Sequence, residues 1–385
     1  MEQTDPKINI PFNRPFIIGN ELEYIQDAVL SGIISGNGKY TKKCQEFMEK
    51  YLPSPHMLLT TSCTDALEMS ALICNIQPGD EVILPSFTYV STANSFALRG
   101  AHLVFVEIRE DTLNLDERLI EAKITKKTSA IVPVHYAGVA CEMDMIMDMA
   151  AFYGLTVIED AAQALAAKYK GRNLGTIGDF GTFSFHETKN IICGEGGAIS
   201  INNQKYRATA DIVWEKGTNK REFSQGDVDK YEWLKLGSSF LPSDILAAFL
   251  YAQLENIEKI INRRQQIFER YHRALLPLER KGLLKVPSVP PECEISYHLF
   301  YLMLNDSQTR NALLHYLQSQ GIMAIFHYIP LHSSPYGSRY GFKRDQLPIT
   351  VRISERILRL PFYYELSEQD QDLIIDTIET FFINY

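Results

Sequence analysis

The chain has 385 residues, of which 45% are hydrophobic and 22% charged, a composition typical of a folded globular protein rather than a disordered one. This length predicts about two domains. The 38 Lys and Arg against 47 Asp and Glu give a net charge of −9 with no basic cluster. Nucleic acid is therefore excluded as the expected main partner, because phosphate backbones require a basic surface.

The sequence predicts neither a membrane span nor a disulfide framework. No run approaches the roughly 18 apolar residues that cross a bilayer, and the polar residues 1–7 do not resemble a signal peptide. The six cysteines are scattered and form no C-x-x-C pair. We expect a cytoplasmic protein with reduced thiols and no membrane partner.

The first two thirds of the chain alternate short apolar runs with helical patterns. Helices are predicted over residues 65–72 and 143–153, the second ending at Gly154. Continuous apolar strands separated by helices indicate an α/β domain with a mostly parallel sheet that is covered on both faces. We place this domain at residues 1–250. Its predicted strands are residues 81–85, 102–107, 129–135, 155–160, 181–185 and 197–201.

The pattern changes near residue 250. A long amphipathic helical pattern runs from Ala247 to Leu276. It is followed by predicted strands at 297–303 and 323–326 and by helices at 310–319 and 369–382. We expect residues 251–385 to form a smaller α+β domain that begins with a long helix.

Several polar residues fall where predicted strands end. Asp160 closes one strand, Lys189 follows another, and residues 60–64, Thr-Thr-Ser-Cys-Thr, precede a helix. Ligands of open α/β sheets bind beyond the carboxyl ends of the strands, and the N–H groups at a helix start bind anions. The sequence therefore predicts one site with a phosphate-binding turn, a buried carboxylate and a lysine.

Pyridoxal phosphate (PLP) chemistry needs these parts. A lysine binds the cofactor covalently, a carboxylate keeps its pyridine nitrogen protonated, and a helix start holds its phosphate. Desolvation beside the ring would lower the pKa of Lys189. Taken singly, Asp160 also fits a helix cap, Lys189 a solvated side chain and Gly194–Gly197 a turn. Dinucleotide and P-loop fingerprints are lacking, and no zinc-site spacing occurs, so no metal is predicted.

Three motifs carry a resemblance to a known family: Asp160-Ala-Ala-Gln163, Ser184-Phe-His-Glu-Thr-Lys189 and Gly194-Glu-Gly-Gly197. They resemble the DegT/DnrJ/EryC1/StrS sugar aminotransferases, and the resemblance extends from Ile10 to the last helix. It implies a PLP-dependent aminotransferase of fold type I. It also implies a homodimer whose active sites lie at the subunit interface.

The resemblance implies roles for individual residues. Lys189 would bind the cofactor covalently, and Asp160 would pair with its pyridine nitrogen. The remaining cofactor contacts would be Gln163 and Tyr89 at the ring and Cys63, Thr64 and Ser184 at the phosphate, and the substrate contacts would be His186, Asn219, His327 and Tyr328.

The sequence departs from the family pattern in two places. Relatives carry a Gly-x-Asn-x-Arg segment whose Asn reaches the neighbouring subunit's phosphate, but here the segment reads Gly237-Ser-Ser239-Phe-Leu241. Ser239 is the expected replacement, with Asn219 as the alternative. Cys193 stands where relatives tend to have glycine, which matters only if the position needs a positive φ.

The resemblance also implies a reaction. Residues 61–64, 137–144, 215–219 and 326–332 resemble the branch that transfers the amino group of L-glutamate to the C4 ketone of TDP-4-oxo-6-deoxyglucose. The products would be TDP-4-amino-4,6-dideoxygalactose, used in surface polysaccharides, and 2-oxoglutarate. The equatorial gluco epimer, a C3-amino sugar and a non-enzymatic PLP-binding regulator are the alternatives. Relatives that dehydrate the sugar carry histidine in place of Lys189, so the lysine favours transamination.

Overall fold

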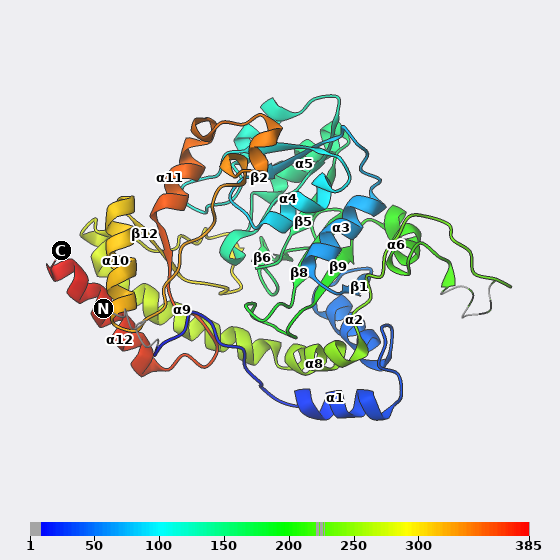
Figure 1. Cartoon of the computed structure of the whole chain (residues 1–385), viewed down its shortest axis with the longest axis horizontal. Coiled ribbons are helices and arrows are strands. Elements are labelled where there is room, and N and C mark those ends of the chain that lie inside the picture. The colour runs from blue at the N-terminus through cyan, green and yellow to red at the C-terminus, as the bar shows by residue number, and fades with distance from the viewer. Residues whose placement is uncertain (1–8, 221–222, 224–225, 227, 385) are drawn as a thin grey trace, which may run out of the picture.

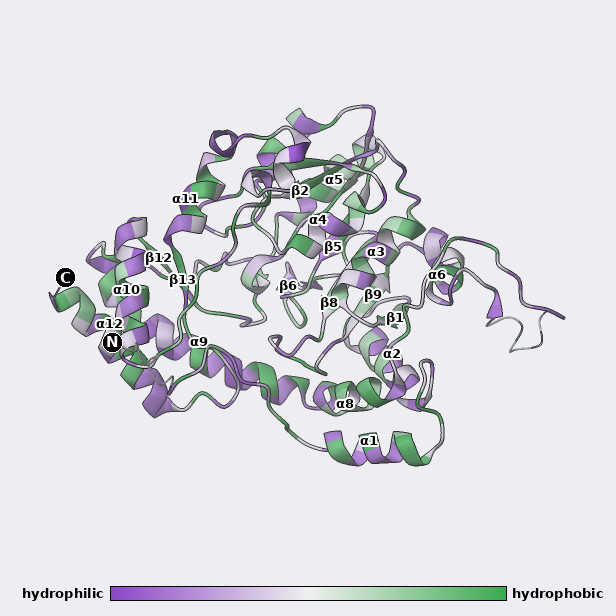
Figure 2. Ribbon diagram, viewed as in Figure 1, coloured by the Kyte–Doolittle hydropathy of each residue, from purple (hydrophilic) through white to green (hydrophobic). Residues whose placement is uncertain are grey.

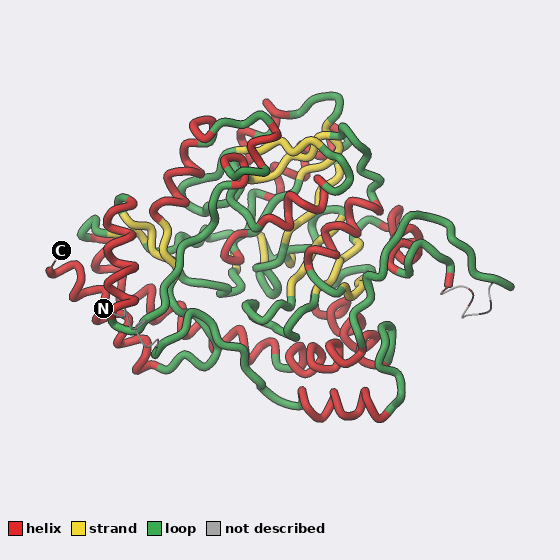
Figure 3. Tube along the Cα trace, viewed as in Figure 1, coloured by secondary structure: helices red, strands yellow, loops and turns green. Residues whose placement is uncertain are grey.

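The computed structural model describes residues 9–220, 223, 226 and 228–384. Its centre is a seven-stranded sheet with the order β1-β9-β8-β5-β4-β2-β3, which Figure 3 shows among surrounding helices. Adjacent strands from β3 to β8 pair in parallel, whereas β9 pairs antiparallel with β1 and β8. The predicted mostly parallel sheet is confirmed. Its strands are β1 (Met57–Thr60), β2 (Glu81–Pro85), β3 (His102–Val106), β4 (Thr128–Ile131), β5 (Thr156–Asp160), β8 (Phe180–Ser184) and β9 (Gly197–Ile201).

Helices cover both faces of this sheet, as predicted (Figure 1). Successive side chains of a strand point to opposite faces, so Ile83 of β2 joins one buried apolar cluster while Val82 and Leu84 join another. The first cluster is completed by α1 (Glu21–Leu30), α2 (Lys39–Tyr51), α5 (Met143–Tyr153) and α8 (Asp244–Glu255), and the second by α3 (Cys63–Ile73), α4 (Val90–Ala97) and α6 (Arg207–Trp214).

The predicted helix over residues 143–153 is confirmed, and Gly154 ends it with a φ of 70°. The predicted strand over 129–135 is too long, because β4 ends at Ile131. Pro133 follows and has no N–H to donate to a sheet. Beyond Pro133 the backbone pairs with β5 through an isolated bridge between Val134 and Asp160.

The helical pattern from Ala247 to Leu276 forms two helices rather than one. Helix α8 ends at Glu255, and α9 (Ile257–Arg280) begins after Asn256, whose φ of −107° and ψ of 14° interrupt the helix. Helix α9 packs Ile257 against the sheet cluster and Tyr271 against a separate C-terminal cluster. Its opposite side is polar, so apolar and polar residues alternate along it in Figure 2.

The C-terminal cluster surrounds a small antiparallel sheet of β10 (Leu284–Lys285), β12 (Tyr301–Leu304) and β13 (Ile357–Arg359). Strand β12 begins later than predicted because the carbonyls of Tyr297 and His298 accept hydrogen bonds from Arg264 instead. The predicted strand at 323–326 is wrong, since this segment makes only an isolated bridge from Ile325 to Arg359. Further elements, apart from short 3₁₀ turns, are α10 (Ser307–Ser319), α11 (Pro348–Arg356), α12 (Glu368–Asn384) and a second small sheet of β6 (Lys168–Tyr169), β7 (Arg172–Asn173) and β11 (Cys293–Glu294). In the described part of the chain, no helix has the length and apolarity that crossing a bilayer requires.

Candidate active site

A cavity of about 680 Å³ lies where the carboxyl ends of β1, β2, β4, β5 and β8 meet. Strands that run in the same direction end at one edge, so residues from distant parts of the sequence converge there. The predicted site residues that line this cavity are Cys63, Thr64, Tyr89, Asp160, Gln163, Ser184, His186, Lys189, His327 and Tyr328.

Asp160, the last residue of β5, is only 6% exposed. Its Oδ2 accepts a hydrogen bond from Thr92 Oγ1 at 2.7 Å, and its Oδ1 accepts one from the backbone N–H of Ala162 at 3.2 Å. No described Lys, Arg or His side chain forms an ion pair with it. A buried carboxylate without a cation is costly, so this position fits a protonated pyridine nitrogen.

Lys189 follows β8 and reaches the same cavity. Loss of solvent around its amine lowers its pKa, and the neighbouring Cys63 and Asp160 partly offset this effect. A lower pKa leaves more of the amine neutral, which is the form that attacks a carbonyl carbon. Within the described residues Lys189 forms no ion pair that would hold the amine away from the cavity.

The start of α3 supplies an anion site. Ser62 caps the helix by accepting the N–H of Asp65 at 3.0 Å, while the N–H groups of Cys63 and Thr64 donate to no described protein atom. A Cβ on Gly197 would lie 2.4 Å from the Ser62 carbonyl carbon, so only glycine lets β9 pass this closely behind the helix start. Burial raises the pKa of the Cys63 thiol and keeps it uncharged. These features fit the cofactor's phosphate.

A chain of hydrogen bonds orders the opposite wall of the cavity. The Ala137 N–H donates to Gln163 Oε1 at 2.7 Å, which leaves the amide Nε2 to donate to the Tyr328 hydroxyl at 3.2 Å. The Tyr328 proton therefore stays free for a ligand. The His327 ring stacks on Tyr328 with centroids 3.5 Å apart, and its Nδ1 lies 2.8 Å from the Tyr136 hydroxyl.

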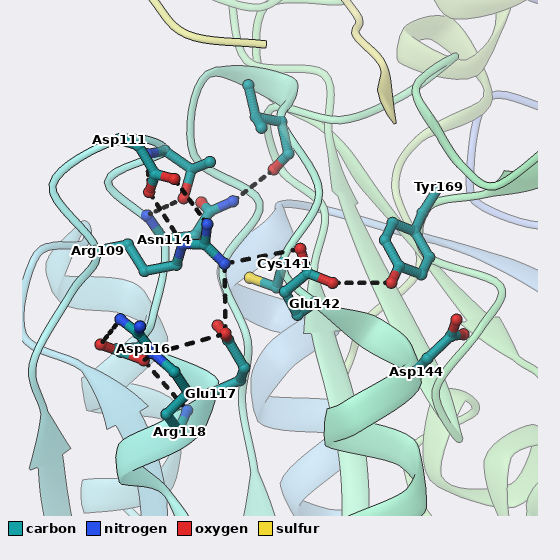
Figure 4. Close-up of polar contacts among 12 residues, drawn as sticks. Arg109, Asp111, Asn114, Asp116, Glu117, Arg118, Cys141, Glu142, Asp144 and Tyr169 are labelled. Carbon is teal, nitrogen blue, oxygen red and sulfur yellow. Dashed lines mark hydrogen bonds and ion pairs between the residues drawn. The ribbon is translucent and has the colours of Figure 1, made fainter. Parts of the chain in front are cut away.

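The loop that carries Tyr136 and Ala137 is held by a polar cluster, whose members Arg109, Asn114 and Glu117 are labelled in Figure 4. Asn114 accepts the Tyr136 N–H and donates to the Val139 carbonyl, both at 2.9 Å. Beside it, Arg109 pairs with Glu117 and Glu142. Ala137 has a φ of 57°, a strained value for a residue with a Cβ. The cluster thus keeps the Ala137 N–H in position to orient Gln163.

A second buried network lies directly behind Asp160. Glu159 and His135 are fully buried, and His135 Nε2 donates to Glu159 Oε2 at 2.9 Å. The same carboxylate accepts the backbone N–H groups of Gly175, Ile177 and Gly178 at 2.6–2.8 Å. Glu159 therefore ties the end of β5 to the turn that precedes β8.

Replacing Glu159 with alanine is expected to lower the free energy of unfolding by about 3–5 kcal/mol, because His135 and three N–H groups lose their acceptor. Urea unfolding followed by circular dichroism measures the change. The matched control is Glu46→Ala on the exposed side of α2, which should stay within about 0.5 kcal/mol of the parent. Equal effects for both variants would contradict a structural role for Glu159.

Two predicted site residues do not line the cavity of this single chain. Ser239 is exposed and lies in an isolated bridge with Glu215. Asn219 is buried, and its Oδ1 accepts the backbone N–H of Glu232 at 2.7 Å. Cys193 is not among the residues with positive φ, so its replacement of glycine imposes no backbone strain.

Sequence reasoning missed three residues of the site. Thr92 holds Asp160, and His298 and Arg359 line the cavity from the C-terminal part of the chain. Thr92 lies within residues 85–94, a stretch that resembles the family, but its role at Asp160 could not be assigned from the sequence; His298 and Arg359 belong to no recognised motif. The helix cap at Ser62, by contrast, could be predicted from the sequence, since Ser followed by Asp three residues later is a known start signal for helices.

The groups that line this one cavity at the edge of an α/β sheet fit a PLP-dependent enzyme of fold type I. The family model described as the DegT/DnrJ/EryC1/StrS aminotransferase family matches residues 15–379, and the chain belongs to this family. This is a PLP-dependent family of sugar aminotransferases, and this chain has Lys189 where the dehydrating relatives carry histidine, as the resemblance implied.

Individual relatives match over nearly the whole chain. The uncharacterized protein MJ1066 of Methanocaldococcus jannaschii is 36% identical, and the spore coat polysaccharide biosynthesis protein SpsC of Bacillus subtilis is 33% identical; each match covers 96% of both chains. The PLP form of the sugar aminotransferase Spr1654 from Streptococcus pneumoniae superposes with a TM-score of 0.89 at 28% identity, covering 97% of this chain and 98% of that one. The structure of Spr1654 with pyridoxamine phosphate (PMP), the aminated form of the cofactor, superposes on this chain with a TM-score of 0.90.

Proposed function

We propose that the enzyme transfers the amino group of L-glutamate to the C4 ketone of TDP-4-oxo-6-deoxy-D-glucose. The products are TDP-4-amino-4,6-dideoxy-D-galactose, for surface-polysaccharide biosynthesis in the cytoplasm, and 2-oxoglutarate. The observation that carries the proposal is Lys189, whose amine shares a cavity with Asp160 and forms no ion pair with any residue that the structure describes. The sequence resemblance over residues 326–332 supports the choice of sugar, because His327 and Tyr328 of this stretch line the cavity.

PLP supplies an electron sink that stabilises negative charge at the carbon bearing the transferred nitrogen. Lys189 Nζ would hold the cofactor between turnovers and, once released, move a proton to and from that carbon. The Asp160 carboxylate would face the pyridine nitrogen and hold its proton in place. The N–H groups of Cys63 and Thr64 and the Ser184 hydroxyl would hold the phosphate, while Tyr89 and Gln163 would orient the ring.

The substrate side of the cavity would be formed by His186, His327 and Tyr328. Because Gln163 donates to the Tyr328 oxygen, the Tyr328 hydroxyl would donate its own proton to an oxygen of the sugar. Burial first, and then the nearby charge of Arg359, lowers the pKa of His327 well below its usual range. His327 would therefore stay neutral and would not attract the diphosphate.

The position and configuration of the new amine decide between the sugar alternatives. With TDP-4-oxo-6-deoxyglucose and glutamate, we expect a 4-amino product with a small H3–H4 coupling constant in the proton NMR spectrum, which marks an axial amine. A large coupling would mean the gluco epimer, and an amine at C3 would mean a different ketone. A normal glutamate step without any amino sugar would contradict the proposed sugar while keeping the aminotransferase class.

We further propose a homodimer with shared active sites, in which Ser239 or Asn219 contacts the partner subunit's phosphate site. The exposed position of Ser239 supports this, as do exposed apolar side chains nearby, including Trp233, Leu234 and Leu236. Light scattering gives the oligomeric state. Mixing Lys189→Ala chains with Ser239→Trp chains tests sharing, because a mixed dimer would regain one intact site if Ser239 acts across the interface.

A further inference from the structure

We propose that Arg359 binds the α-carboxylate of the amino-acid donor, an assignment that rests on the donor half of the proposed reaction. Arg359 ends β13, where its backbone pairs with Ile325: the Arg359 N–H donates to the Ile325 carbonyl at 2.7 Å, and the Arg359 carbonyl accepts the Ile325 N–H at 3.1 Å. This fixed backbone presents the side chain to the cavity that also contains Lys189. The guanidinium lies 4.8 Å from the centre of the Phe12 ring.

The charge of Arg359 has no counter-ion in the described structure. Its Nη2 donates only a long hydrogen bond, 3.4 Å, to the carbonyl of Phe326, and its Nε is closed off from solvent without any partner. No described Asp or Glu oxygen lies within 4.0 Å of it. By contrast, Arg352 on the neighbouring α11 pairs with Glu110. A largely buried cation without an anion is costly, and an anionic ligand at the open Nη1 would offset that cost.

Three kinds of anion enter this site during the reaction: the cofactor's phosphate, the diphosphate of the nucleotide sugar and the carboxylates of the amino-acid donor. The geometry favours a carboxylate as the ligand of Arg359. The cofactor's phosphate already has the start of α3, where two N–H groups are free. The guanidinium lies against the Phe12 ring, and the His327 and Tyr328 rings are close enough to interact with its charge. These aromatic surroundings suit a compact group better than a hydrated diphosphate. A carboxylate matches the planar, forked guanidinium in shape and charge.

The nearby Lys189 selects the α-carboxylate over the side-chain carboxylate of the donor. Arg359 is close enough for its charge to contribute to the lowered pKa of Lys189, after the larger effect of desolvation. The α-carboxylate is attached directly to the carbon whose proton Lys189 must take. An anion held by Arg359 would therefore place this carbon beside the Lys189 amine.

The test uses the holoenzyme of the parent, Arg359→Gln and Arg359→Lys. For Arg359→Gln we expect kcat/KM of the L-glutamate half-reaction to fall about 100-fold or more, whereas the half-reaction of the pyridoxamine form with the nucleotide sugar changes less than about threefold. Arg359→Lys keeps the charge but loses the fork, so its loss should be smaller. Arg339→Gln, an exposed arginine that stacks on Tyr336, is the matched control and should resemble the parent.

A binding measurement separates this assignment from the identity of the sugar. Calorimetry with succinate, a dicarboxylate that cannot react, should show at least about tenfold weaker binding to Arg359→Gln than to the parent. A donor that lacks the α-carboxylate, 4-aminobutyrate, should react equally with both proteins. If Arg359→Gln keeps its succinate affinity and its glutamate half-reaction but loses the sugar half-reaction, Arg359 binds the nucleotide sugar and the inference is wrong. If the parent aminates another sugar, the proposed function fails while the role of Arg359 stands.

Discussion

Replacing Lys189 with alanine is expected to reduce turnover at least about ten-thousandfold and to remove the visible absorbance of the covalently bound cofactor. The variant loses both the nucleophile that binds PLP and the base that moves the proton. Turnover with glutamate measures the first loss. Borohydride reduction followed by mass spectrometry measures the second, because it would fix the cofactor to Lys189 in the parent and to no residue in the variant.

Lys168→Ala is the control for this experiment. Lys168 lies on β6 and pairs with Glu294 at 3.0 Å, so its replacement removes a lysine charge outside the cavity. It should keep the absorbance and the turnover of the parent. An active Lys189→Ala enzyme, or a cofactor adduct on another lysine, would refute the role assigned to Lys189.

Replacing Asp160 with asparagine is expected to slow the glutamate half-reaction about 100- to 1,000-fold while cofactor binding persists. Asparagine retains the size of the side chain and its acceptor oxygen for Thr92, but a neutral amide cannot hold a proton on the pyridine nitrogen. Stopped-flow absorbance measures the rate in enzyme whose cofactor content has been matched to the parent. An unchanged rate would show that the carboxylate charge is not used.

Two further variants test whether the charge of Asp160 or its orientation causes this loss of rate. Thr92→Val removes the 2.7 Å hydrogen bond to Asp160 and should slow the reaction only about tenfold, because the charge remains and only its orientation is released. Asp148→Asn, on the exposed side of α5, should have no effect. An equal loss in Thr92→Val and Asp160→Asn would mean that position, rather than charge, limits the rate.

Much of the site could be predicted because it depends on short local patterns. Asp160 ends a strand and Lys189 follows another, and parallel strands bring such positions to one edge of a sheet. Strands and helices with a clear apolar period, such as 81–85 and 143–153, were predicted with correct bounds. Predictions failed where a non-local contact overrides the pattern, as at Tyr297 and His298, whose carbonyls bind Arg264 rather than a neighbouring strand.

The sequence by itself determined the fold class and that Lys189 and Asp160 belong to one site, because motif spacing and strand periodicity are properties of contiguous residues. Only the tertiary structure decided how these groups are held. Thr92 reaches Asp160 across 68 positions, and Tyr328 reaches Gln163 across 165. It also decided that Arg359 lines the cavity with no counter-ion among residues 9–220, 223, 226 and 228–384. Such facts depend on which side chains the packed sheets bring together and which of them lack a partner, and no local pattern encodes that.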